Sequence, residues 1–340
     1  MAFDAKYCPD AIYNPTRSVL LNDENYLYRL REHPEKDDPD YVSVLRDPDG
    51  AHDACELSDT FYFTPGQGAQ PRIAGYHEHR KGFELFMVGG EGAKCLIRVR
   101  GRQTWAYPGD MIFLPPATPH SFLWYGNPLR WREMFSGMRM NPGGNANWRI
   151  LEFHPDAHDD PEFEAVYQSH SDYIAHDHPT RFADADDIPE VIRLGAGAAA
   201  FELNGVRMLQ KVTRAQWWGQ REVWQFRLPE GFTITCPHSN DREQILMVYA
   251  GQVRVRIRGV AEFVAKQWDY VDIPAWLDAE LTVLSDEAVV FDMNCQGYLY
   301  SALEEIAMRA EGEPRLLADE AALRSILLKN DVRLFGVPKN

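Results

Sequence analysis

The sequence lacks three features that would tie it to a membrane, an oxidising compartment or a nucleic acid. No apolar run approaches the roughly 20 residues of a membrane-spanning helix, and the opening MAFDAKYCPDAIYNP has no apolar core like that of a secretory signal. The 5 cysteines, scattered from Cys8 to Cys295, include no close pair. Basic residues are few, since 35 Lys and Arg stand against 51 Asp and Glu and the net charge is −16. We therefore expect a cytoplasmic protein with reduced thiols that neither enters a membrane nor binds nucleic acid.

The chain does contain enough apolar material for a folded protein. Hydrophobic residues make up 45% and aromatic residues 12% of its 340 residues, which is too apolar for a disordered chain. A chain of this length can bury two cores of ordinary size. We expect a two-domain globular protein whose partner is a small molecule.

Two stretches of the chain have the residue pattern of all-β domains. Between Thr60 and about Met140, and again between Phe201 and Tyr300, short runs rich in Val, Ile, Phe and Trp are separated by Gly and Pro. Such a series is typical of antiparallel barrels and jelly rolls. The expected fold class is all-β, with two barrels, an irregular N-terminal lead-in and short C-terminal helices. The expected boundaries are 1–58 for the lead-in, 59–150 for the first barrel, 151–195 for an acidic connector with a short helix, 196–300 for the second barrel and 301–340 for the helices.

The two β regions also match each other in pattern. ELFMVGGEG in the first region parallels QILMVYAGQ in the second, and PGDMIFLPP parallels QWDYVDIPA. Internal repetition of this kind indicates a duplicated unit. We therefore expect two related barrels.

The first β region carries residue types that bind metals. GYHEHRKGFELF supplies His77, His79 and Glu84, and PPATPHSF supplies His120. Because side chains alternate along a strand, His77 and His79 point to one face, which inside a barrel is the cavity. Glu84 follows after a short turn, and His120 begins a later strand after a Pro-rich turn. The pattern predicts that these side chains meet in the cavity.

Three imidazoles and one carboxylate suit one divalent first-row metal ion and do not suit an all-oxygen calcium site. Iron is the expected ion, with Mn, Ni, Co, Cu and Zn as alternatives. A five- or six-coordinate ion would keep one or two positions for substrate, oxygen or water. The alternative is that the histidines are surface or core residues of a barrel without metal.

These motifs resemble those of the cupin family. In the first cupin motif, His-x-His is followed after three or four residues by Glu, as it is here. The second motif has Gly, Pro and His at the spacing of Gly109, Pro115 and His120, although Ala117 and Trp124 depart from its usual residues. The resemblance implies two jelly-roll cupin barrels, the first with a metal held by all four residues.

The second β region lacks this set. One alignment of the two regions places at the ligand positions Pro237, Ser239, Gln244 and either Asp278 or Ala279. An alignment shifted by one residue brings in Cys236, His238 and Glu243, still without a fourth ligand. We expect the second barrel to be a structural half without metal.

A metal-bearing first barrel, a connector and a degenerate second barrel resemble quercetin 2,3-dioxygenase-type enzymes, over residues 60–300. The resemblance implies an oxidoreductase that cleaves or oxidises a small oxygenated molecule, with Glu84 as both ligand and catalytic base. The residues expected to line the substrate pocket are Tyr76, Phe86, Phe122 and Trp124. Aromatic residues at such positions also fill ordinary barrel cores.

Other functions stay open. A second hypothesis is a non-redox isomerase, decarboxylase or lyase that acts on a sugar acid or keto acid, with the metal as a Lewis acid. A third is a two-barrel protein that binds a ligand without catalysis. Resemblance to cupins also leaves a homodimer open, through pairing of edge strands. The histidines of the connector, between His154 and His178, fit a solvated acidic loop better than a metal site.

Overall fold

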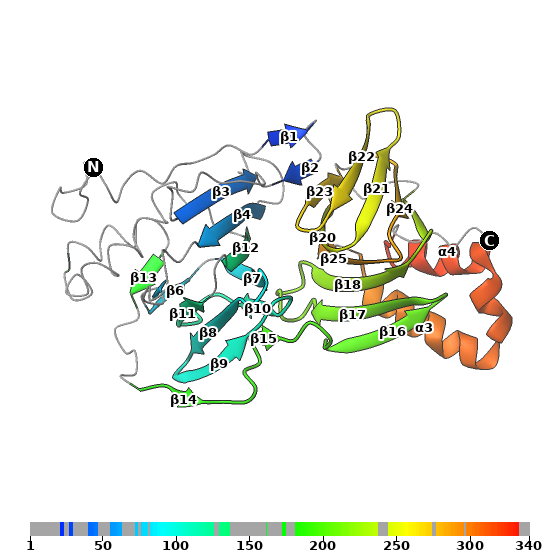
Figure 1. Ribbon diagram of the computed structural model, residues 1–340. Helices are drawn as coiled ribbons and strands as arrows, with labels where there is room; N and C mark the ends of the chain where they lie inside the picture. Colours follow the sequence, from blue (N-terminus) through cyan, green and yellow to red (C-terminus); the bar gives the residue numbers. More distant parts are fainter. Residues whose placement is uncertain are drawn as a thin grey trace. The chain divides into compact units, whose positions relative to one another are not determined.

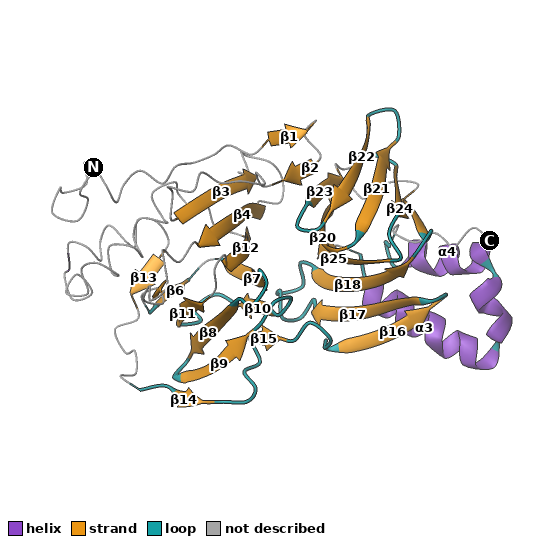
Figure 2. Ribbon diagram, viewed as in Figure 1, coloured by secondary structure: helices purple, strands orange, loops and turns teal. Residues whose placement is uncertain are grey.

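The structure is a computed structural model, and it consists mostly of strands (Figures 1 and 2). Its chain divides into two compact units, residues 1–20 with 31–194 and residues 21–30 with 195–340. Within the part that the structure describes, neither α-helix is long and apolar enough to span a bilayer. The described residues are 21–23, 27–29, 40–46, 55–62, 72–73, 76–80, 82–125, 129–136, 161, 172–174, 181–236, 244–273, 277–295 and 297–332.

The first unit is a barrel built from two sheets. Its strands are β3 (Asp40–Arg46), β4 (Cys55–Tyr62), β5 (Arg72–Ile73), β6 (His77–His79), β7 (Phe83–Gly89), β8 (Lys94–Val99), β9 (Arg102–Ala106), β10 (Met111–Leu114), β11 (His120–Tyr125), β12 (Leu129–Ser136), β13 (Asp172–Ile174), β14 (Ala183–Asp184) and β15 (Val191–Ile192). One sheet has the order β15-β10-β7-β12-β4-β3, and the other runs β13-β6-β11-β8-β9-β14, with β5 paired to β11. Burial alternates along β8, as expected for a strand with one face in the core.

The second unit repeats this architecture. Its strands are β1 (Leu21–Asp23), β2 (Leu27–Arg29), β16 (Ala199–Leu203), β17 (Val206–Val212), β18 (Glu222–Pro229), β19 (Thr233–Cys236), β20 (Gln244–Ala250), β21 (Gln252–Ile257), β22 (Ala261–Lys266), β23 (Tyr270–Ile273), β24 (Ala279–Val283) and β25 (Glu287–Cys295). They form an eight-stranded sheet, β1-β2-β23-β20-β25-β18-β17-β16, and a four-stranded sheet, β19-β24-β21-β22. The all-β class with two barrels is thereby confirmed.

Backbone hydrogen bonds support the predicted duplication. The amide of Val88 donates to the carbonyl of Asp110 over 3.2 Å, and the amide of Val248 donates to the carbonyl of Asp269 over 3.0 Å. Asp110 directly precedes β10, which pairs with the strand of Val88, and Asp269 directly precedes β23, which pairs with the strand of Val248. The two valines are therefore equivalent positions in the two barrels.

Two short helices close the chain, as predicted. Helix α3 (Leu299–Gly312) buries Leu299, Ala302, Leu303 and Ile306, and these side chains belong to the core of the second barrel. Helix α4 (Glu320–Lys329) is capped by Asp319, whose side chain accepts a hydrogen bond from the amide of Ala322. A 3₁₀ helix, η2 (Pro314–Ala318), connects them.

The segments outside the two β regions contribute more strands than expected. In the lead-in, β2 pairs with β23 of the second unit, and β3 pairs with β4 in the first. At the end of the connector, β14 and β15 pair with β9 and β10, and Ile188 and Val191 join the first barrel's core. Apart from Pro161, the helix expected near Asp160 lies outside the described residues, as do the histidines of the connector.

Candidate metal centre

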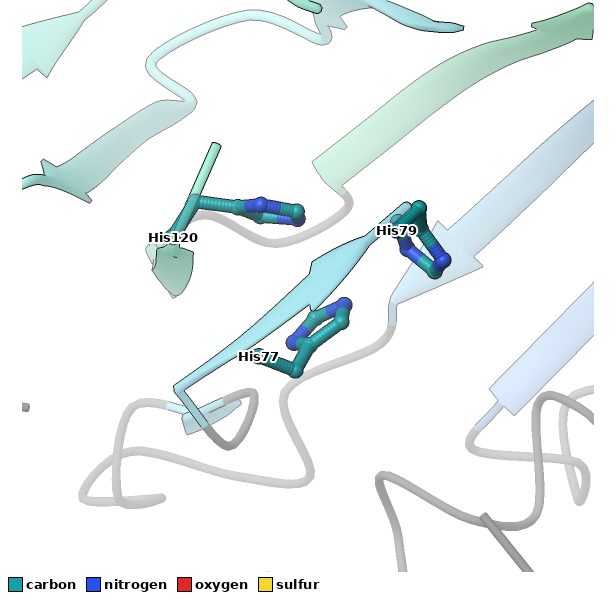
Figure 3. A group of neighbouring side chains, drawn as sticks. All are labelled: His77, His79 and His120. Carbon is teal, nitrogen blue, oxygen red and sulfur yellow. The ribbon is translucent and has the colours of Figure 1, made fainter. Parts of the chain in front are cut away.

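The three histidines predicted from the sequence converge inside the first barrel. His77 and His79 lie on β6, and His120 begins β11, where it is the direct cross-strand partner of His77. The ring centroids of His77 and His120 are 4.4 Å apart, and one nitrogen from each of the three rings lies within 4.8 Å of the others. All three side chains are buried. Figure 3 shows the three rings directed toward one another.

Glu84, at the start of β7, completes the cluster. Its Oε1 atom lies 3.0 Å from Nε2 of His79, and its Oε2 atom lies 3.2 Å from Nε2 of His120. Only 3% of Glu84 is exposed, so water does not solvate this carboxylate. The structure thus brings together all four residues that the motifs singled out. That they bind a metal stays a prediction.

The ring of His120 is held in one tautomer. Its Nδ1 atom lies 2.8 Å from the backbone carbonyl oxygen of Thr118, which can only accept, so Nδ1 carries the hydrogen. Nε2 then presents a lone pair to Glu84, and within the described chain it has no hydrogen-bond partner. Burial, followed by the nearby rings of His77 and His79, holds the pKa of His120 well below its usual range.

A lone pair that faces a carboxylate oxygen across 3.2 Å is unfavourable unless a proton or a metal ion lies between them. The lowered pKa of His120 disfavours a proton on its Nε2 atom. A metal ion fits, because Nε2 is free to bind it while Nδ1 donates to a backbone carbonyl, the usual arrangement for a ligating histidine. The donor set of imidazole nitrogens and carboxylate oxygen suits a first-row transition metal.

Aromatic side chains lie beside the cluster. The ring centroid of Phe122 is 5.2 Å from that of His120, and Phe122 also packs on Phe86 at 5.0 Å and on Trp124 at 5.6 Å. All three belong to the buried apolar core of the first barrel. Tyr76, the residue before His77, has its ring 5.6 Å from that of Phe182. The assignment of these four residues to a substrate pocket remains a prediction.

Two residues next to the site are not marked by the sequence motifs. Trp131, fully buried on β12, packs on Phe86 and Phe122 with centroids 5.0 Å from each. The alternation of Leu129 and Trp131 with two arginines in LRWREMF was the available signal, but the pairing of β12 with β7 decides that Trp131 faces inward. Thr118 stands two residues before His120, and only the folded turn brings its carbonyl to the ring.

Strand register explains why neither alignment of the second barrel matched the ligand set. Cys236 pairs with Ala279 as His77 pairs with His120. Gln244 precedes Val248 by as many residues as Glu84 precedes Val88, so Gln244 takes the place of Glu84. Seven positions separate His77 from Glu84, whereas eight separate Cys236 from Gln244, so no single frame fits both.

The second barrel carries a polar network at its corresponding position. The Nε2 atom of Gln244 donates to Oδ2 of Asp292 over 2.7 Å. Burial is the main cause that raises the pKa of Asp292 to about 7, and the nearby charge of Glu222 adds to it. Within the described residues, only His77, His79 and His120 form a group of three or more metal-ligating side chains with this spacing. His238 and Glu243 lie outside those residues.

Comparisons with known proteins agree with this architecture. No family model matches the chain, and no curated protein matches it. A solved structure of oxalate decarboxylase that concerns its substrate binding mode is 11% identical, with 86% of this chain and 85% of that chain covered and a TM-score of 0.51. Two variants of the Bacillus subtilis oxalate decarboxylase, one with a changed SENS segment and one with Trp replaced by Phe, are each 12% identical at the same coverage and TM-score. At such identities the likeness concerns the fold alone, and it agrees with the two-barrel fold predicted from the sequence.

Proposed function

We propose that the first barrel is the centre of a metal-dependent enzyme that acts on a small oxygenated acid as a decarboxylase, lyase or isomerase. The observation that carries the proposal is the contact of the buried Glu84 carboxylate with ring nitrogens of His79 and His120, which calls for a cation. The choice of a reaction without net oxidation of the substrate is supported by the likeness in fold to proteins that decarboxylate oxalate. This choice replaces the dioxygenase as the leading hypothesis.

In this proposal His77, His79, His120 and Glu84 hold the ion. A bound divalent ion supplies Lewis-acid chemistry, which orients substrate oxygens and stabilises negative charge on them. The carbonyl of Thr118 keeps His120 in the tautomer that leaves Nε2 available. These contacts fix the ring before any ligand arrives, so little reorganisation is needed during the reaction.

Glu84 is the residue placed to move a proton. Its carboxylate can take the proton that a substrate hydroxyl or carboxyl releases on binding. In a decarboxylation the C–C bond breaks, CO2 leaves, and the electron pair left on carbon takes that proton back from Glu84. The apolar cluster around Phe122 lowers the local dielectric constant, which strengthens the electrostatic interactions of the site.

The dioxygenase is the second candidate, and one observation favours it. Phe86, Phe122 and Trp124 form an aromatic cluster that begins 5.2 Å from the ring of His120. Aromatic side chains beside the site suit a planar aromatic substrate such as a flavonol or a catechol.

The test begins with the purified full-length chain and its metal content, measured by elemental analysis. Small dicarboxylic, keto and sugar acids are then incubated with the protein under nitrogen, and products and CO2 are followed by NMR and mass spectrometry. In parallel, an oxygen electrode records uptake with flavonols, catechols and enediols. Glu84→Gln and His79→Ala serve as site variants, and Glu262→Gln, an exposed carboxylate on β22, is the matched control.

Turnover under nitrogen that disappears in both site variants and persists in Glu262→Gln supports the proposal. Substrate-dependent oxygen uptake with the same dependence on Glu84 and His79 replaces it with the dioxygenase. Metal binding without turnover of any compound favours a ligand-binding protein. A wild-type chain that binds no first-row metal contradicts all three.

A further inference from the structure

Two consecutive hydrogen bonds connect Arg100, through Thr118, to the ring of His120. Arg100 follows β8, and its Nη2 atom donates to Oγ1 of Thr118 over 3.0 Å. The carbonyl oxygen of Thr118 in turn accepts from Nδ1 of His120 over 2.8 Å. We propose that Arg100 and Thr118 are positioning residues for the metal centre, which hold the turn before β11 so that Nε2 of His120 points at the ion. The inference rests on the proposed function.

Thr118 is well placed for this role because it is 1% exposed and its side chain and carbonyl serve different partners. The hydroxyl is anchored by a cation, and a hydrogen bond to a charged donor is stronger than one between neutral groups. Because Arg100 holds the side chain of Thr118, the carbonyl of Thr118 keeps its position beside the imidazole of His120. The ring orientation of His120 therefore depends on a group outside the ligand set.

Arg100 is itself anchored from two directions. Its Nη1 atom lies 3.3 Å from Oε1 of Glu190, in the segment that also contributes Ile188 and Val191 to the core. Its backbone amide donates to the carbonyl of Pro119 over 3.2 Å. The guanidinium thus spans the turn before His120 and the segment that ends the connector.

The same turn also holds the second ligand strand. The amide of Ala117 donates to the carbonyl oxygen of His79 over 2.7 Å, and Ala117 has a φ of 57°, in the left-handed region that is costly for a non-glycine residue. One turn is therefore bonded to the backbone of His79 and to the ring of His120. Anchoring this turn controls the distance between two of the ligands.

The second barrel shows which contacts of Arg100 are common to both barrels and which occur only beside the candidate metal centre. Arg258 is the equivalent of Arg100, because its amide donates to the carbonyl of Asp278 just as that of Arg100 donates to Pro119. The backbone bond is therefore common to both barrels. The side chain of Arg258 pairs with the carboxylate of Asp278 at 2.9 Å, and the next residue is Ala279 in place of His120. Only the first barrel couples this arginine, through a threonine, to an imidazole.

The test uses Co²⁺ as the probe on the full chain, with affinity measured by competition against a chelator and ligand geometry by the visible absorption of bound Co²⁺. Thr118→Val keeps the shape and the carbonyl but removes the hydroxyl, whereas Thr118→Ser retains the hydroxyl. Arg100→Met removes the guanidinium, and Arg258→Met is the matched control in the second barrel. Circular dichroism and thermal unfolding verify that each variant is folded.

We expect Thr118→Val and Arg100→Met each to weaken Co²⁺ binding by about tenfold, the lower end of the usual effect of groups that orient ligands, and to change the visible spectrum alike. The double variant should bind no more weakly than either single variant, because both changes break one connection. Thr118→Ser and Arg258→Met should keep wild-type affinity.

Wild-type affinity and an unchanged spectrum in Thr118→Val and Arg100→Met would overturn the inference and leave the metal centre intact. Additive losses in the double variant would also overturn it, because the two residues would then act separately. If the wild type binds no Co²⁺ or other first-row ion, the proposed function fails first and the inference falls with it.

Discussion

The Nε2 atom of His120 lies 3.2 Å from Oε2 of Glu84, while the opposite nitrogen of the same ring donates to Thr118. Two acceptors thus face each other in a buried site. The arrangement is unfavourable for the protein alone and favourable once a cation bridges them. A change at Glu84 should therefore raise the free energy of unfolding of the metal-free protein and lower its metal affinity.

Glu84→Gln tests this opposition. An amide keeps the shape of the carboxylate and supplies a donor to Nε2 of His120, so the metal-free protein should be stabilised, by about 1 kcal/mol. Metal affinity should fall by at least about tenfold, because a charged ligand has been lost. Unfolding in the presence of a chelator, together with metal titration, measures both quantities. A metal-free variant less stable than the metal-free wild type would argue against the bridging cation.

Metal removal should lower the stability of the wild type. An ion present at 100 times its dissociation constant adds about 2.7 kcal/mol to the free energy of unfolding, if it binds only the folded state. Thermal unfolding with and without a chelator measures the difference. His79→Ala should abolish it, and Cys236→Ala, at the position in the second barrel equivalent to His77, should keep it. A shift that survives in His79→Ala would place the ion elsewhere.

The second barrel should lose stability as pH rises toward neutrality. Burial, with a smaller effect of Glu222, raises the pKa of Asp292 from 3.8 to about 7, so the folded state binds the proton more tightly than the unfolded state. The stabilisation from this proton is fully present below pH 4 and is lost as pH rises through 7, with an upper bound of about 4 kcal/mol.

Asp292→Asn checks the origin of that pH dependence. The amide resembles the protonated acid and cannot ionise, so the variant's free energy of unfolding should depend less on pH between 4 and 7. Denaturant unfolding at several pH values gives the comparison. Equal slopes for the variant and the wild type in this range would rule out Asp292 as the titrating group.

Replacement by Phe should destabilise the protein by different amounts at the two fully buried tryptophans Trp131 and Trp224. The indole nitrogen of Trp224 donates to Oε2 of Glu222 over 2.6 Å, whereas that of Trp131 has no hydrogen-bond partner within the described chain. Trp224→Phe removes one donor from a buried carboxylate that keeps its contacts with Arg214 and the amide of Tyr300, so it should cost more than Trp131→Phe by about 1 kcal/mol. Chemical denaturation of both variants measures the difference. Equal costs would mean that the bond to Glu222 contributes nothing net.

Much of the candidate site follows from the sequence because its information is local. His77 and His79 share a strand face by parity, and the spacing to Glu84 and the turn before His120 are read directly from neighbouring residues. The second barrel shows the limit of such reading. One extra residue between Cys236 and Gln244 defeats any alignment in a single frame, and only the pairing of β19 with β24 reveals it.

The sequence by itself determined the all-β class, the duplication and the residues that meet at the candidate metal centre, since strand alternation and motif spacing act over a few residues. Tertiary structure alone decided that β2 joins the sheet of the second unit, that Trp131 faces the core beside Phe122, and that Thr118 selects the tautomer of His120. Each of these depends on which distant strands or turns pair. Every residue except proline offers the same backbone donor and acceptor, so the pattern of side chains along one strand does not specify its partner strand.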